Sequence, residues 1–169
     1  MAKAAFNKLA AFVIAASAAA ALTSCHSIDD DRIPVMPVNI LFPTVAEWNV
    51  YGVAGATDYR YFILENRVPS NFPYTAISAT GYGGVLLVSD VLGEPKAFDL
   101  SCPVEAQRDV RVAIDTESMT ARCDKCGSEY DVFSLLGYPL GGPAAEKGYA
   151  LRRYYVGAGR DGSYRQIGY

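Results

Sequence analysis

Apolar side chains in this sequence recur mainly at every second position, in short runs. Over residues 110–115, Val110, Val112 and Ile114 alternate with Arg111 and Ala113, which is the pattern of a strand with one buried face. Gly, Pro, Asp or Ser bounds each run of this kind. The pattern predicts strands at residues 59–64, 84–89, 97–100, 110–115, 119–123, 149–156 and 163–167, and an extended edge segment at 32–39, where proline alternates with apolar residues.

Helical periodicity is weak by comparison. After the N-terminal segment, no window of twelve or more residues carries a convincing helical stripe. Residues 135–145 contain three glycines and two prolines, and we expect a loop there. A turn at 115–118 joins the strands on either side of it as a hairpin. The sequence therefore predicts a single all-β domain over residues 40–169, built as a sandwich or a barrel.

The first 25 residues differ from the rest in composition. Lys3 and Lys8 precede an apolar, alanine-rich run at residues 9–21, and Leu22-Thr-Ser-Cys25 follows. This order is typical of a secretory signal peptide, predicted at residues 1–24, and the run is too short for a spanning helix. A cysteine after Leu-Thr-Ser resembles a bacterial lipobox, which implies a lipid on Cys25. An ordinary signal peptide with an incidental cysteine is the alternative.

Lipidation would place the chain in the bacterial cell envelope, as an outer-membrane lipoprotein that is held by lipid and does not span the membrane. Residues 25–39 would then form the lipidated N-terminus and a linker. His26-Ser27 and the acidic stretch Asp29-Asp-Asp31 resemble the surface-export tag of lipoproteins in some Gram-negative lineages. The alternative is an acidic, solvated linker.

The charge balance limits the classes of partner. The chain has 15 basic and 18 acidic side chains, a net charge of −3, and no basic patch that would indicate nucleic-acid binding. No second apolar run of about 18 residues follows the N-terminal segment, so we expect a soluble domain. The membrane, reached through lipid, is the partner that the sequence predicts. The sequence does not identify a protein partner.

Four cysteines constrain the chemistry further. With Cys25 lipidated, Cys102, Cys123 and Cys126 remain. Three thiols in an oxidising compartment cannot all be paired in disulfides within the chain. The count therefore indicates either a metal site or one disulfide beside a free thiol.

The spacing of these cysteines resembles the cluster-binding half of the Rieske iron–sulfur family. Cys102-Pro-Val and Cys123-Asp-Lys-Cys126 stand where that family has its two ligand loops, and residues 137–144 resemble its closing loop. The resemblance covers about residues 80–156. It implies a Rieske-like sandwich or barrel with a small cluster-binding subdomain, in which the hydroxyls of Ser128 and Tyr130 hydrogen-bond to cluster sulfurs.

The chain departs from the Rieske pattern at both histidine ligands. Val104 and Cys126 occupy those positions, and His26 is the only histidine. Valine cannot bind iron, so a 2Fe–2S cluster would need Glu105 as a fourth donor. The first expectation is therefore no cofactor, with a disulfide from Cys102 to Cys123 or Cys126. Zinc on the three thiols with Glu105 or water, an altered 2Fe–2S cluster, and free thiols are the alternatives.

These observations predict a protein that is not an enzyme. The expected function is that of an envelope-anchored, Rieske-like lipoprotein with a lost or altered cluster and a structural or binding role. The alternative is a metal-dependent electron-transfer protein. A thiol oxidoreductase is disfavoured because residues 127–132 resemble the start of a strand, whereas a reactive Cys-x-x-Cys opens a helix. A hydrolase with a nucleophile–histidine pair is excluded because the domain has no histidine.

Overall fold

The computed structural model describes residues 28–169, and over this range the chain has the predicted all-β fold. The predicted signal peptide, Cys25 and His26 lie outside the described residues. In chain order the elements are β1 (Val38–Phe42), α2 (Val45–Tyr51), β2 (Tyr59–Phe62), β3 (Ala79–Thr80), β4 (Val85–Ser89), β5 (Pro95–Asp99), β6 (Ala113–Asp115), β7 (Thr120–Arg122), β8 (Glu129–Asp131), β9 (Tyr138–Gly141), α3 (Gly142–Lys147), β10 (Arg153–Gly157) and β11 (Arg165–Gly168).

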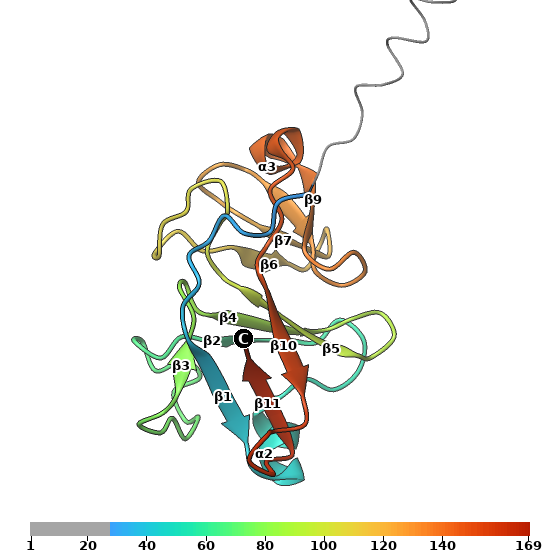
Figure 1. Cartoon of the computed structure of the whole chain (residues 1–169). Helices are drawn as coiled ribbons and strands as arrows, with labels where there is room; N and C mark the ends of the chain where they lie inside the picture. The colour runs from blue at the N-terminus through green and yellow to red at the C-terminus, as the bar shows by residue number, and fades with distance from the viewer. Residues whose placement is uncertain (1–27) are drawn as a thin grey trace, which may run out of the picture.

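Seven strands form one antiparallel sheet that curls into a nearly closed barrel (Figure 1). The strand order is β2-β4-β5-β10-β11-β1-β3, so β1 lies between the last strand of the chain and β3. Aromatic rings fill the interior. Phe42, Phe62 and Phe72 meet edge to face, with ring centroids 5.1 to 5.8 Å apart. Such contacts stabilise a core beyond the effect of the buried area.

The strand β4 joins this barrel core to a second core. Val85, Leu86, Leu87 and Val88 are all fully buried. Successive side chains of a strand point to opposite faces, so Val85 and Leu87 pack in the barrel, whereas Leu86 and Val88 pack with residues of a smaller sheet. The uninterrupted apolar run at 84–89 therefore reflects burial on both faces.

The smaller sheet has the order β6-β7-β8-β9 and is inserted between β5 and β10 of the barrel. β5 and β10 are neighbours, with Phe98 opposite Arg153 and Ala97 opposite Tyr154, although more than fifty residues separate them along the chain. Figure 1 shows the smaller sheet and α3 at one end of the molecule and α2 at the other. This insertion carries all three described cysteines.

The predicted hairpin and most predicted strands are confirmed within one to four residues at their ends, with Asp115 opposite Thr120 across the turn. Two predictions about strands and loops need correction. Strand 110–115 is shorter than expected, because Arg111 forms only an isolated bridge with Ser101 and β6 begins at Ala113. Residues 135–145 are not a loop, because they contain β9 and most of α3.

The two helices within residues 28–169 are short, which explains why the sequence showed no helical stripe there. Thr44 and Glu47 form a reciprocal capping box that starts α2, and the seven residues of this helix include none that is buried. In α3, Pro143 lies in the first turn and Gly148 ends the helix with φ of 71°. Within residues 28–169, neither helix has the length and apolarity needed to cross a membrane.

A buried carboxylate at the end of β5 binds the backbone at the point where the chain enters the cysteine-bearing insertion. Asp99 accepts hydrogen bonds from the backbone N–H groups of Tyr82 and Ser101, at 2.9 and 2.7 Å, and from the Tyr154 hydroxyl at 2.5 Å. Gly83 donates a further backbone bond at 3.1 Å. Burial raises the pKa of this carboxyl group even though these hydrogen bonds act to lower it. The network thereby fixes the backbone just before Cys102.

Candidate metal centre

Three cysteines are brought together by two loops of the insertion. Cys102 follows β5, and its backbone N–H donates to Val110 O at 2.9 Å. Cys123 follows β7 and opens a tight turn, in which Gly127 N donates to Cys123 O at 2.8 Å. Gly127 has φ of 70°, a conformation that glycine adopts without strain. This turn carries Cys126 back beside the other two thiols.

The three Sγ atoms all lie within 4.8 Å of one another. Sγ of Cys102 and Sγ of Cys126 are 3.5 Å apart, and all three residues are free thiols. Cys102 and Cys123 are fully buried, whereas Cys126 is partly exposed. The three residues could therefore hold a metal ion, with access from solvent on the side of Cys126.

Two hydroxyl groups contact the sulfurs at the predicted positions. The Tyr130 hydroxyl lies 3.6 Å from Cys102 Sγ, and Ser128 Oγ lies 3.1 Å from Cys126 Sγ. The backbone N–H of Ala144, at the start of α3, donates to the same Ser128 Oγ at 3.1 Å. Ser128 and Tyr130 are both fully buried. The hydroxyl of Ser128 therefore links the thiol cluster to α3.

Burial dominates the electrostatics of the site. It raises the pKa of the Cys102 thiol to about 12, against hydrogen bonds from the Glu105 backbone and the Tyr130 hydroxyl. Burial also opposes ionisation of Cys126, but hydrogen bonds with Ser128 and the two neighbouring thiols together outweigh it and lower its pKa. Burial and the proximity of Cys102 raise the pKa of Tyr130, so its hydroxyl stays protonated. A bound cation would favour the thiolate form of all its ligands.

Glu105 does not belong to the converging group. Its carboxylate lies 2.8 Å from Lys125 Nζ, in an ion pair that connects the two cysteine loops. Among the described residues, only the three cysteines place their ligand atoms together in this way. Val104 packs against the core beside the cluster and offers no donor atom. Lys125 was missed by the sequence analysis, because nothing along the chain shows that its loop faces Glu105.

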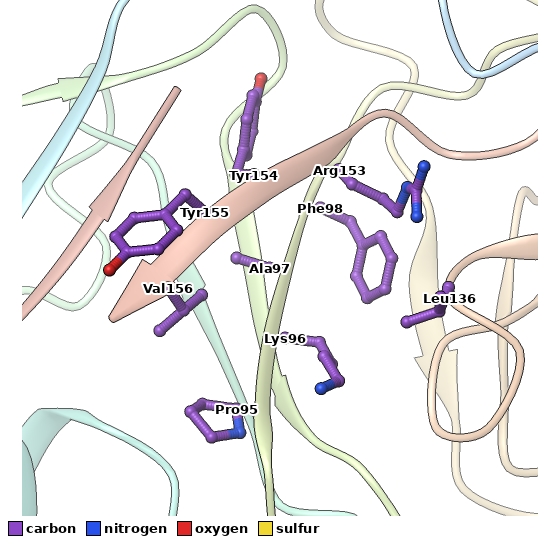
Figure 2. A pocket seen from close by; sticks show the side chains of 9 residues that line it. All are labelled: Pro95, Lys96, Ala97, Phe98, Leu136, Arg153, Tyr154, Tyr155 and Val156. Carbon is purple, nitrogen blue, oxygen red and sulfur yellow. The ribbon is translucent and has the colours of Figure 1, made fainter. Parts of the chain in front are cut away.

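A separate groove of about 230 Å³ lies where β5 and β10 meet the loop before β9 (Figure 2). Figure 2 shows Phe98 extending toward Leu136, Lys96 on the same side of the strand, and Arg153 above them. Lys96 and Arg153 each lie within 3.6 Å of an aspartate oxygen. No cysteine lines the groove. Because both basic side chains are already paired with aspartates, the groove is a weaker candidate for a functional site than the thiol cluster.

Comparison with known proteins adds no relative. No protein-family model matches the chain, and no curated protein or solved structure matches it either. The resemblance to the Rieske family therefore stays a prediction that rests on residues of this chain.

Proposed function

We propose that this chain is a lipid-anchored protein of the bacterial cell envelope, with no catalytic activity of its own, that uses a single metal ion on Cys102, Cys123 and Cys126 to hold its smaller sheet together. The observation that carries the metal proposal is the convergence of the three Sγ atoms within 4.8 Å. The lipid anchor is supported by the lipobox-like sequence that ends at Cys25.

The distances between sulfurs favour one tetrahedral ion. Zinc–sulfur bonds of about 2.3 Å place the thiolates of a tetrahedral site about 3.8 Å apart. The separation of 3.5 Å between Cys102 and Cys126, with all three pairs inside 4.8 Å, agrees with that geometry. In a 2Fe–2S cluster, ligands on different irons lie on opposite sides of the cluster and diverge. Three mutually close thiols therefore support zinc over the altered Rieske cluster.

The donor set also favours a structural role. Three thiolates overcompensate the charge of Zn²⁺, so a water in the fourth position is less acidified than on an ion held by neutral histidines. Within the described residues no histidine can act as a general base, since His26 is the only one in the sequence. The ion would instead fasten the loop after β5 to the turn after β7. The proposal thus keeps the structural or binding lipoprotein that the sequence suggests, and replaces the disulfide expected there with a metal ion.

Elemental analysis and thiol titration of the full chain, produced in a bacterium that lipidates it, test this proposal. We expect about one zinc per chain, in the ratio that a single three-thiolate site requires. Three thiols should become reactive only after chelation. The Cys126→Ser variant should lose most of the zinc, whereas Cys25→Ser should keep it and lose the lipid.

The same measurements contain the results that would refute the metal ion. Iron with a visible absorption band would establish the 2Fe–2S alternative and an electron-transfer role. A single free thiol that rises to three after reduction would establish the disulfide. Three reactive thiols without any metal would leave the cysteines as ordinary core residues.

A further inference from the structure

The start of the described chain is fixed to the domain by its backbone, although the sequence predicted a linker there. Asp29 forms a parallel bridge with Tyr149. Its N–H donates to Gly148 O at 2.8 Å, and its carbonyl accepts from Ala150 N at 2.8 Å. Ile33, a few residues later, is only 1 % exposed. The segment is therefore part of the folded domain.

Two ion pairs reinforce this attachment. Asp30 pairs with Arg153, and Asp31 pairs with Arg152, each with a nitrogen–oxygen distance of 3.0 Å. Arg152 is only 4 % exposed and also donates to Ile33 O at 2.8 Å. Two of the three aspartates are thus paired with arginines of the domain, although the side chain of Asp31 remains 83 % exposed.

This attachment places the N-terminal end of the described chain at one end of the molecule. Figure 1 shows that the described part of the chain begins beside β9 and α3, at the opposite end from α2. Cys25 precedes Ile28 by three residues. Three residues span at most about 10 Å when fully extended, so a lipid on Cys25 must lie close to this end of the domain.

The side chains at this end have the chemistry of a membrane interface. The guanidinium carbon of Arg32 lies 4.7 Å from the centroid of the Tyr149 ring, and Lys147 Nζ lies 5.8 Å from it. Leu140, just before α3, is 49 % exposed, and Ile28 is 42 % exposed. Tyrosine suits the headgroup level of a bilayer, and basic side chains there keep their charge in the headgroups. We call these five residues the α3 surface.

We infer that the α3 surface lies against lipid headgroups. This contact orients the barrel so that α2 is directed away from the membrane. This inference rests on the proposed lipid anchor at Cys25, because the short distance to Ile28 leaves the domain little room to turn. A long flexible tether would instead allow every orientation. The thiol cluster then lies in the half of the molecule nearest the membrane, since Ser128 Oγ is bonded to Ala144 of α3.

Tryptophan quenching by brominated lipid measures this orientation. Trp48, on α2, is the only tryptophan and can be replaced by phenylalanine. In that background, Leu140→Trp places a probe on the α3 surface, and Val50→Trp places a matched, exposed probe on α2. The full-length lipidated proteins are inserted into vesicles of phosphatidylethanolamine and phosphatidylglycerol with brominated chains. We expect the brominated chains to quench the fluorescence of Leu140→Trp and to leave that of Val50→Trp almost unchanged.

The outcomes separate the orientation from the anchor. Flotation with vesicles together with quenching confined to Leu140→Trp supports the inference. Flotation with equal quenching of both probes, or with no quenching of Leu140→Trp, overturns the orientation and leaves the anchor intact. Failure of the protein to float refutes the anchor. In that case, absence of quenching of Leu140→Trp at excess vesicles also refutes contact of the α3 surface with lipid.

Discussion

Replacing Ser128 with alanine removes one oxygen atom that has two partners at the thiol cluster. Ser128 Oγ accepts from the Ala144 backbone N–H and contacts Cys126 Sγ, both at 3.1 Å. Ala144 and Ser128 are each fully buried. In the Ser128→Ala variant the N–H of Ala144 therefore loses its acceptor in a place that water does not reach.

The expected loss follows from that burial. A buried donor left without a partner costs about 1–3 kcal/mol, more than the net contribution of an ordinary hydrogen bond. For a domain of this size, a loss of 1 kcal/mol lowers the melting temperature by about 3 °C. Ser128→Ala should therefore melt about 3–9 °C below the parent protein.

Ser89 provides a matched control within the same fold. It is also a fully buried serine, but its Oγ has no hydrogen-bond partner in the part of the chain that the structure describes. Alanine there keeps the backbone bonds of Ser89 to Thr57 and Asp58 and removes only an unpaired hydroxyl. Ser89→Ala should change the free energy of unfolding by no more than about 0.5 kcal/mol, or should stabilise the protein.

Urea unfolding of the parent and both variants, followed by circular dichroism, compares their free energies of unfolding. The comparison holds if the m value is the same for all three proteins. The measurement is run on metal-free, reduced protein, so that a change in metal affinity cannot account for the result. If Ser128→Ala is as stable as the parent, or if the two alanine variants lose the same free energy, then the bond to Ala144 does not stabilise the smaller sheet and the reasoning is refuted.

Three further predictions concern the metal, a buried acid and the N-terminal segment. Chelation should destabilise the parent protein, because the ion binds only the folded state, and should leave the Cys126→Ser variant almost unchanged; thermal melts with and without chelator check this. Because burial raises the pKa of Asp99 above its unfolded value of about 3.9, the folded state binds the proton more tightly. The stability of the parent should therefore fall as the pH rises from about 4 through the folded pKa, and Asp99→Asn should flatten this slope in pH-dependent urea unfolding; an unchanged slope would contradict it. Arg152→Met should free the N-terminal segment and increase amide hydrogen exchange at Ala150, whereas Arg153→Ala, which breaks an exposed ion pair, should have a smaller effect.

The sequence predicted strands well where either one face or both faces of the strand are buried. Val112 points into the core between Arg111 and Ala113, as the alternation required, and the run at 84–89 became the doubly buried β4. The prediction was wrong at 135–145, where glycines and prolines indicated a loop. Glycine and proline end regular structure inside long elements, but they also fit the ends of short ones, as in β9 and α3.

The site could be predicted only as a set of residues. The odd number of cysteines left after the expected lipidation of Cys25, and the spacing of Cys123 and Cys126, indicated a shared site with Cys102. The three Sγ atoms do converge. Glu105 was a reasonable fourth donor by its position beside Val104. Its carboxylate is instead bound to Lys125, which comes from the other cysteine loop. A contact between two loops has no periodicity along the chain that sequence analysis could detect.

By itself, the sequence determined the all-β class, the hairpin that leads into Cys123 and the residues that can bind a metal, because each of these depends on local patterning or on the chemistry of single side chains. Only the tertiary structure decided that β5 and β10 are neighbours, that Ser128 reaches α3, and that the acidic N-terminal stretch is attached to the domain. The physical reason is that these contacts join residues far apart in the chain, and their free energy depends on burial and geometry that exist only after folding.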